Sequence, residues 1–375
     1  MLRLGRRELA ILGVLLAVVS GCSTEREPSG DAVASGPAVE WKLVTTWPKN
    51  LPALGTAPER LAERVEAMSA GRFTIKVYSA GELVPAFEVF DAVAGGTAEM
   101  GHGAAYYWRG KLPIAAVFTT APFGMNAQEM NGWLRFGGGM ELWRELYEPF
   151  GVVPIATGNS GAQMAGWFNK EIRSLADIQG LKMRIPGLGG EVFSRAGGVP
   201  VSMPGSDMFT ALQTGVIDAT EWIGPYNDLA FGLQEIARYY YYPGWHEPSA
   251  VLEAIINREA WESLPDDLRA ILETACTATN QEVLDEFTAR NASALKVLVE
   301  EHGVEIRLLP DDVLKRFAEL SMEVLEEEAQ GDDLSRRVLD SYRSFLADMR
   351  EYHAISEQAY INARSDVEAA TALEP

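Results

Sequence analysis

The amino-acid sequence predicts an α/β protein of two lobes, with mixed or parallel sheets followed by long carboxy-terminal helices. Three observations lead to this fold class. Between residues 41 and 220, segments with the apolar or alternating pattern of strands are followed by segments with helical spacing. A length of 375 residues suits two lobes of ordinary domain size. Beyond Pro310 the apolar side chains follow helical spacing alone.

The first elements have clear periodicity. Residues 41–44 are predicted to form a strand, and residues 57–68 a helix with apolar side chains at helical spacing. Residues 73–78 alternate between apolar and polar, which is typical of a half-buried strand. Residues 85–93 then read as a helix that Gly95-Gly96 ends.

The middle of the chain repeats the alternation of strand and helix. Its apolar runs are short and bounded by Gly or Pro, which suits strands buried on both faces. The expected strands are 152–156, 165–168, 181–185 and 216–219, and the expected helices are 190–196 and 208–214.

The carboxy-terminal region carries two apolar stripes, separated by a break at Gly331. The first stripe is Val313, Phe317, Leu320 and Val324, and the second is Leu334, Val338, Phe345, Met349 and Tyr352. Helices of this length either lie over both lobes or pair with a second protomer. The pattern alone favours neither arrangement.

The composition narrows the class of partner and of site. There are 53 acidic against 32 basic side chains, a formal net charge of −21. This excess of acid disfavours nucleic acid, whose phosphates require clustered Lys and Arg. The two Cys, Cys22 and Cys276, and only four His disfavour a disulfide framework and a Cys- or His-based metal cluster. Any bound metal should be a hard ion with oxygen ligands.

Residues 1–21 have the pattern of a targeting segment, with three arginines ahead of the apolar run 9–19. The run is too short to span a bilayer as a mature helix. Val19-Ser20-Gly21-Cys22 resembles the bacterial lipoprotein cleavage box, in which the Cys is lipidated, and an ordinary secretory signal is the alternative. Residues 22–40, rich in Ser, Gly, Pro and Glu, are predicted to be a flexible tether.

Familiar catalytic motifs are incomplete in this chain. Gly187-Leu188-Gly189-Gly190 lacks the third glycine of a dinucleotide-binding loop, and His246-Glu247 lacks the second His of a zinc protease. Cys276 lies in a helical apolar pattern, which favours a buried inert thiol over a nucleophile. No set of nucleophile, base and orienting group emerges, which disfavours an enzyme.

Arg184 is the first candidate for a binding residue. It lies between Met183 and Ile185 and before Pro186, so its guanidinium should emerge at the end of a strand. A desolvated Arg must be paired, and a ligand carboxylate accepted by two parallel N–H groups is one natural partner. An internal Arg–Glu bridge is the alternative.

Two acidic residues stand beside aromatic ones at predicted strand ends. Glu221 precedes Trp222, and Glu247 follows a run of rings and His246, which we expect to be a hydrogen-bonded wall residue. With the amide oxygen of Gln163, these carboxylates could hold Na⁺ or Ca²⁺. Ordinary carboxylates at the rim of a cleft are the alternative.

Aromatic and amide side chains also gather beside turns. Tyr106-Tyr107-Trp108 follows a Gly-rich segment, and Asn159 and Gln163 flank Gly161. Aromatic clusters usually belong to a core, but several beside turns fit a cleft that closes.

Six motifs together resemble the solute-binding subunits of TRAP transporters, the tripartite ATP-independent periplasmic class. The likeness extends over residues 40–345, and its last two motifs resemble the branch that binds 2-oxo acids or lactate with a metal ion. The motifs are Thr45-Thr46-Trp47-Pro48, Ala104-Ala105-Tyr106-Tyr107-Trp108, Pro122-Phe123-Gly124-Met125, Leu181-Lys182-Met183-Arg184, Asp218-Ala219-Thr220-Glu221-Trp222 and Tyr242-Pro243-Gly244-Trp245-His246-Glu247-Pro248.

The resemblance implies a role for each matching residue. Arg184 would clamp the ligand carboxylate, and Asn159 with one of Tyr106 or Tyr107 would hydrogen-bond the ligand. A cation would bridge ligand and protein. Its implied ligands are Gln163, Glu221, the main-chain carbonyl of Trp222, and Glu247, with Gln163 and Trp222 also close to the ligand.

The resemblance also implies a two-lobed periplasmic binding protein with a hinge, and a dimer formed through a long carboxy-terminal helix. The expected divisions are a lipoprotein signal peptide (1–21), a tether (22–40), lobe 1 (41–163 plus 250–290), lobe 2 (164–249 plus 291–309) and a helical region (310–375). Lipidation of Cys22 would anchor the mature protein to a membrane in the periplasm. This anchor departs from many relatives, which are freely soluble.

The predicted function is to capture a small 2-oxo or 2-hydroxy monocarboxylate, such as pyruvate or lactate, with a bridging Na⁺ or Ca²⁺. The protein would deliver this ligand to the membrane permease subunits. A binding protein for another organic acid is the nearest alternative, and a metal-assisted periplasmic hydrolase or lyase is a second one.

Overall fold

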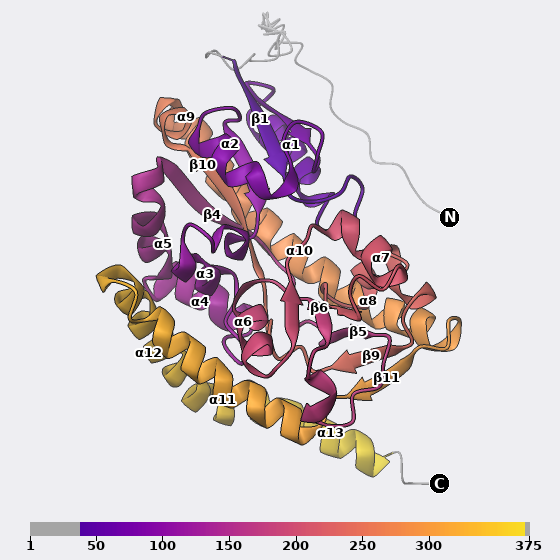
Figure 1. Ribbon diagram of the computed structural model, residues 1–375. Coiled ribbons are helices and arrows are strands. Elements are labelled where there is room, and N and C mark those ends of the chain that lie inside the picture. Colours follow the sequence, from indigo (N-terminus) through magenta and orange to yellow (C-terminus); the bar gives the residue numbers. More distant parts are fainter. Residues whose placement is uncertain (1–37, 372–375) are drawn as a thin grey trace, which may run out of the picture. The chain divides into compact units, whose positions relative to one another are not determined.

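The computed structural model describes residues 38–371 (Figure 1). The predicted signal peptide and the lipidation residue Cys22 lie outside the described residues. The predicted tether, 22–40, overlaps the start of the first strand by two residues. The first strand already begins at Val39, because its N–H donates to the Arg72 carbonyl at 2.7 Å and starts the pairing with the next strand.

The first sheet has five strands in the order β2-β1-β3-β10-β4. Strand β1 is parallel to β2 and β3, whereas β10 is antiparallel to β3 and β4, so the sheet is mixed as predicted. Its strands are β1 (Val39–Thr45), β2 (Phe73–Tyr78), β3 (Met100–Gly103), β4 (Val152–Asn159) and β10 (Val251–Asn257). The helices that contact it are α1 (Ala57–Met68), α2 (Val89–Ala94), α3 (Ala116–Thr119), α5 (Gly139–Tyr147), α9 (Arg258–Ser263) and α10 (Asp266–Glu300).

Alternation along β1 explains how helices cover both faces of this sheet. Trp41 and Leu43 are buried in one cluster with side chains of α1 and α10, while Val44 points into the other core with side chains of α2. Cys276 on α10 is buried in the first of these clusters, as its apolar pattern predicted.

The second sheet has six strands in the order β11-β9-β5-β8-β6-β7. Its strands are β5 (Gly166–Phe168), β6 (Lys182–Arg184), β7 (Val199–Val201), β8 (Ala219–Thr220), β9 (Tyr239–Tyr242) and β11 (Glu305–Leu308). Its neighbouring helices are α6 (Gly187–Arg195), α7 (Gly205–Gln213) and α8 (Pro225–Ala230).

The strand predicted at 216–219 is shorter than expected and starts at Ala219. The N–H groups of Val216 and Ile217 both donate to the Ala211 carbonyl and so complete the end of α7. Because these donors are used there, they are not free to pair with a neighbouring strand.

The chain passes from the first sheet to the second between β4 and β5, and returns between β9 and β10. Helix α10 contacts elements on both sides, because it packs on β4 and α1 as well as on α8 (Figure 1). The α/β fold class with two sheets is therefore confirmed. The predicted lobe boundaries and the hinge remain predictions.

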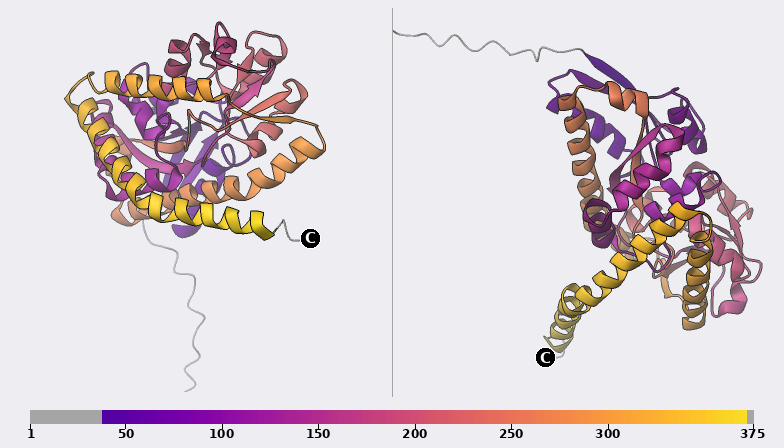
Figure 2. Two further views of the ribbon diagram at one scale, coloured as in Figure 1. Left: turned by 90° about the horizontal axis from the view of Figure 1, so that it is seen from below. Right: turned by 90° about the vertical axis from the view of Figure 1, so that its left-hand side faces the viewer.

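The carboxy-terminal region forms α11 (Asp311–Glu328), α12 (Asp333–Ile355) and α13 (Glu357–Thr371). Helix α11 packs on α6 of the second sheet, and α12 packs on α5 and on α4 (Ala127–Phe136) (Figure 2). These helices therefore lie over both parts of the chain. The first predicted stripe is fully buried. In the second stripe only Val338 is buried, while Leu334, Phe345 and Met349 are half-buried and Tyr352 is 55 % exposed. Among residues 38–371, no helix has the length and apolar composition that crossing a membrane requires.

Candidate functional site

The predicted site residues come from strand ends and from the segments that connect the two sheets. Arg184 is the last residue of β6, and Glu221 and Trp222 directly follow β8, its parallel neighbour. Asn159 ends β4, and Glu247 lies between β9 and β10. Because neighbouring parallel strands end at the same edge of a sheet, Arg184 and Glu221 meet there.

The Arg184 side chain is buried, and every hydrogen bond that it makes stays inside the protein. Its Nη1 forms an ion pair and hydrogen bond with the Glu221 carboxylate. Its Nη2 donates to the Tyr107 hydroxyl at 3.4 Å and its Nε to the Met203 carbonyl at 3.3 Å. The guanidinium carbon also lies 5.0 Å from the centre of the Trp222 ring. The internal Arg–Glu bridge, one of the two predicted alternatives, is thus present, and the guanidinium lies among the other candidate residues.

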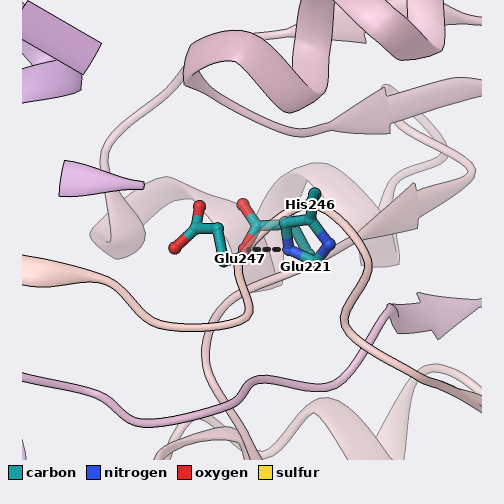
Figure 3. A group of neighbouring side chains, drawn as sticks. All are labelled: Glu221, His246 and Glu247. Atoms are coloured by element: carbon teal, nitrogen blue, oxygen red, sulfur yellow. Dashed lines mark hydrogen bonds and ion pairs between the residues drawn. The ribbon is translucent and has the colours of Figure 1, made fainter. Parts of the chain in front are cut away.

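Glu221, His246 and Glu247 form a buried cluster (Figure 3). One ligand atom from each lies within 4.8 Å of the other two, and His246 Nε2 is 3.4 Å from Glu221 Oε2. Burial, and then the charge of Glu221, raise the pKa of Glu247 well above its usual value. Two buried carboxylates at this distance are unfavourable together in their charged forms, and a cation between them would relieve the repulsion.

Two buried amides next to this cluster each have an atom without a partner among the described residues. Gln163 Nε2 donates to Glu247 Oε2 at 2.7 Å and to the Ser160 hydroxyl at 3.2 Å, but Gln163 Oε1 accepts no hydrogen bond. Asn159 Oδ1 accepts from the Gly161 N–H at 2.8 Å, while Asn159 Nδ2 has no acceptor. Buried polar atoms are rarely left unpaired, so these two atoms are available to a bound ligand or ion.

Aromatic rings line a small cavity next to Gln163. Tyr106 and Tyr107 lie in a short helical turn (Ala105–Trp108), with ring centres 4.7 Å apart in an edge-to-face arrangement. Both line a cavity of about 10 Å³, enough for about one water molecule. The remaining lining residues are Trp47, Leu54, Ser160, Gln163, Trp222, Ile223, Ala250 and Leu252. The structure therefore brings both tyrosines to the cavity, and Tyr107 also contacts Arg184.

The residues present fit a hard cation. Glu221 and Glu247 offer carboxylate oxygens, and Gln163, whose Nε2 bonds to Glu247, has an unpaired amide Oε1 next to the cluster. Ions of the Na⁺ and Ca²⁺ type prefer such oxygen ligands. His246 is buried and its Nε2 lies 3.4 Å from Glu221 Oε2, which agrees with the predicted hydrogen-bonded residue.

The Gly-rich segment that is not a nucleotide loop has a packing role here. Gly187 has a φ of +63°, and Gly189 lies so close to His246 that a Cβ there would come within 2.8 Å of the His246 Cβ. The small residues let the amino-terminal end of α6 approach the site. Leu54, Ile223 and Leu252, in the cavity wall, had no sequence signal that separates them from ordinary core residues.

The model of the bacterial extracellular solute-binding proteins of family 7, also named DctP, matches residues 43–332. That range includes both sheets apart from the first four residues of β1.

Three relatives illustrate the similarity. A monocarboxylate 2-oxoacid-binding periplasmic protein from Nostoc sp. strain PCC 7120 is 39 % identical over 361 residues, which are 96 % of this chain and 99 % of the relative. A TRAP periplasmic solute-binding protein from Pseudoalteromonas atlantica T6c, with bound sodium and pyruvate, is 40 % identical with a TM-score of 0.84, covering 87 % of this chain and 99 % of its own. A TRAP transporter solute-binding protein from Bordetella bronchiseptica RB50 is a dimer of mixed occupancy, with calcium and picolinate in one active site and an apo second site. It is 37 % identical with a TM-score of 0.87, covering 90 % of this chain and 100 % of its own.

Proposed function

Since this chain belongs to family 7 of the bacterial extracellular solute-binding proteins, we propose that it captures a small 2-oxo or 2-hydroxy monocarboxylate, such as pyruvate, with a bridging Na⁺ or Ca²⁺. It works as the periplasmic binding subunit of a TRAP transporter and delivers the acid to the membrane permease. The observation that carries this proposal is the buried group of one guanidinium, two carboxylates and an unpaired amide oxygen.

The charges of the site explain why an anion and a cation bind together. Arg184 contributes one positive charge, while Glu221 and Glu247 contribute two negative ones when both are ionised. A monocarboxylate alone would add a third negative charge to a buried site. A cation held by Glu221, Glu247, Gln163 Oε1 and the Trp222 carbonyl would offset that charge and would polarise the 2-oxo or 2-hydroxy oxygen of the ligand.

Arg184 and Glu221 would exchange partners on binding. The guanidinium, now paired with Glu221, would present its two parallel N–H groups to the ligand carboxylate, which would leave a Glu221 oxygen free to hold the cation. Asn159 Nδ2 would donate to the ligand, and Tyr107 is the tyrosine that we assign to the ligand contact, because it already contacts Arg184.

The carboxy-terminal helices support a homodimer, which we include in the proposal. The end of α12 and the start of α13 expose several large apolar side chains, which a second copy could cover. They are Tyr352 (55 % exposed), Ile355 (80 %), Tyr360 (65 %) and Ile361 (44 %). Lipidation of Cys22, which would anchor the protein to a membrane in the periplasm, is a further proposal.

Recovery of the bound acid tests the proposal against the enzyme alternative. The protein is incubated with pyruvate and Ca²⁺, separated from free ligand, denatured, and the released acid is identified by mass spectrometry. We expect one unchanged pyruvate and one Ca²⁺ per chain. A converted product would support the hydrolase or lyase, and release of no acid would contradict the proposed ligand class.

A further inference from the structure

A turn between β1 and α1, residues 48–56, reaches from the first sheet to the part of the chain that forms the second. Asn50 and Ala53 in this turn have φ values of 60° and 57°, a left-handed conformation that residues other than glycine adopt at a cost. Such strain persists where surrounding contacts hold it, and it often accompanies function. Leu54 in the same turn is buried and lines the cavity of the site.

The partner of this turn is Asn227 on α8, whose side chain is fully buried. Asn227 Nδ2 donates to the Pro52 carbonyl at 2.8 Å, and Asn227 Oδ1 accepts from Trp222 Nε1 at 3.1 Å. An indole N–H can only donate and a carbonyl can only accept, so these partners fix the orientation of the amide. One side chain therefore joins the turn of the first sheet to Trp222 in the site.

Trp222 connects this amide to the binding group. Its ring lies under the guanidinium of Arg184 and meets the Trp47 ring edge to face, with centres 6.2 Å apart. Trp47 and Trp222 both line the cavity. The buried side-chain amide of Asn227 thus both contacts Pro52 and fixes the position of Trp222.

We propose that Asn227 is a positioning residue which retains the bound ligand by joining the Pro52 carbonyl to the Trp222 indole when the protein closes. This inference rests on the proposed function, because it assumes a ligand that is enclosed and released. Because the bond between Asn227 and Pro52 joins the two parts of the chain, we expect it to form on closing and to break before release. It should slow dissociation without changing the rate of encounter.

A second contact between the same parts of the chain is more exposed. Glu286 on α10 accepts from the Tyr226 hydroxyl at 3.1 Å and pairs with Arg60 of α1 at 2.7 Å. Arg60 and Glu286 both belong to predicted lobe 1, so only the Tyr226–Glu286 bond crosses between the two parts. Glu286 is 19 % exposed, so water screens that bond more than the fully buried Asn227 amide. We therefore assign the control of release to Asn227.

The test compares Asn227→Asp and Asn227→Ala with wild type, using stopped-flow tryptophan fluorescence with pyruvate and Ca²⁺. Asn227→Asp keeps an acceptor for Trp222 but turns a carboxylate toward the Pro52 carbonyl, and Asn227→Ala removes both bonds without adding charge. The matched control is Asn291→Ala, because Asn291 Oδ1 accepts from the Tyr226 N–H on the same helix without contacting Trp222 or Pro52.

We expect dissociation to become ten- to a hundredfold faster in both Asn227 variants, about the effect of a lost buried hydrogen bond. The association rate should stay near wild type, as should all values for Asn291→Ala. The ligand-free Asn227→Ala variant should fold with a lower melting temperature, because it leaves the buried Trp222 Nε1 without its acceptor. Unchanged dissociation, or loss of folding in both Asn227 variants, would overturn the inference and make the residue merely structural. Absence of pyruvate binding to the wild type would instead contradict the proposed function.

Discussion

Glu253 on β10 allows a quantitative prediction about stability. Its carboxyl is fully buried and accepts a hydrogen bond from Trp108 Nε1. The Tyr147 hydroxyl lies 3.2 Å from Glu253 Oε1 and 3.0 Å from Glu253 Oε2 and donates to the same carboxyl. Burial raises the pKa of Glu253 to about 8, and these two hydrogen bonds only partly oppose that increase. The folded protein therefore keeps a proton that the unfolded chain, with an ordinary value of 4.5, has already released.

The sign and size of the effect follow from this difference. The native state binds more protons than the unfolded state between pH 4.5 and about 8, so the free energy of unfolding falls as the pH rises through that range. Each pKa unit corresponds to about 1.4 kcal/mol, so the full loss is about 5 kcal/mol. Above pH 8 both states are ionised and the loss no longer grows.

Glu253→Gln removes this titration while keeping the volume and an oxygen that accepts from Trp108 and Tyr147. The free energy of unfolding of the variant minus that of wild type should therefore rise by about 5 kcal/mol as the pH increases from 4.5 to 8. Urea unfolding, followed by circular dichroism at several pH values without added metal, measures this difference. The control is Glu259→Gln, an exposed position on α9.

Two stability curves that stay parallel from pH 4.5 to 9 would refute the reasoning, because Glu253 would then titrate equally in both states. The reasoning would also be refuted if the stability advantage of Glu253→Gln over wild type grew as the pH falls.

Three further predictions concern the site, the thiol and the core. Arg184→Lys should weaken pyruvate binding about a hundredfold in calorimetry, because Lys lacks the two parallel donors. The control Arg195→Lys, on the surface of α6, should leave the affinity unchanged. Near wild-type affinity for Arg184→Lys would exclude the carboxylate clamp. Burial raises the pKa of Cys276 to about 12, so this thiol should react with a thiol reagent only after unfolding, and rapid reaction in the native protein would contradict its burial. Phe118 is stacked between two tryptophan rings. Phe118→Ala should therefore lower the free energy of unfolding, measured in urea, by about 3–5 kcal/mol. A loss under about 1 kcal/mol would mean that the core collapses around the gap.

Local periodicity was sufficient for several elements and insufficient for others. The helix 57–68 and the strand 73–78 have the predicted bounds, because their alternation reflects one buried face. Strand β10 was not predicted, since Val251–Asn257 is an almost continuous apolar run that suits a helix as well as a strand. The 35 residues of α10 were also not foreseen, because its buried face changes partners from β4 to α8 along its length.

The family and the fold were correctly inferred from motifs that unite residues far apart in the chain. The candidate residues Arg184, Glu221 and Glu247 meet in one buried group, although their ligand roles remain predictions. Asn227 was not recognised, because its contact with Pro52 spans 175 positions and nothing in the local sequence indicates it. Sequence reasoning thus found the charged centre, and the contact between the two parts of the chain required the structure.

The most direct test of the proposed function is isothermal titration of the chain from Ser23 onward, stripped of metal, with pyruvate in the presence and absence of Na⁺ or Ca²⁺. The proposed site predicts tight binding only when the cation is present, because Glu221, Glu247 and the ligand carboxylate otherwise repel one another. Equal affinity without the cation would contradict the bridging ion, and no binding of pyruvate or lactate under any condition would contradict the proposed ligand class.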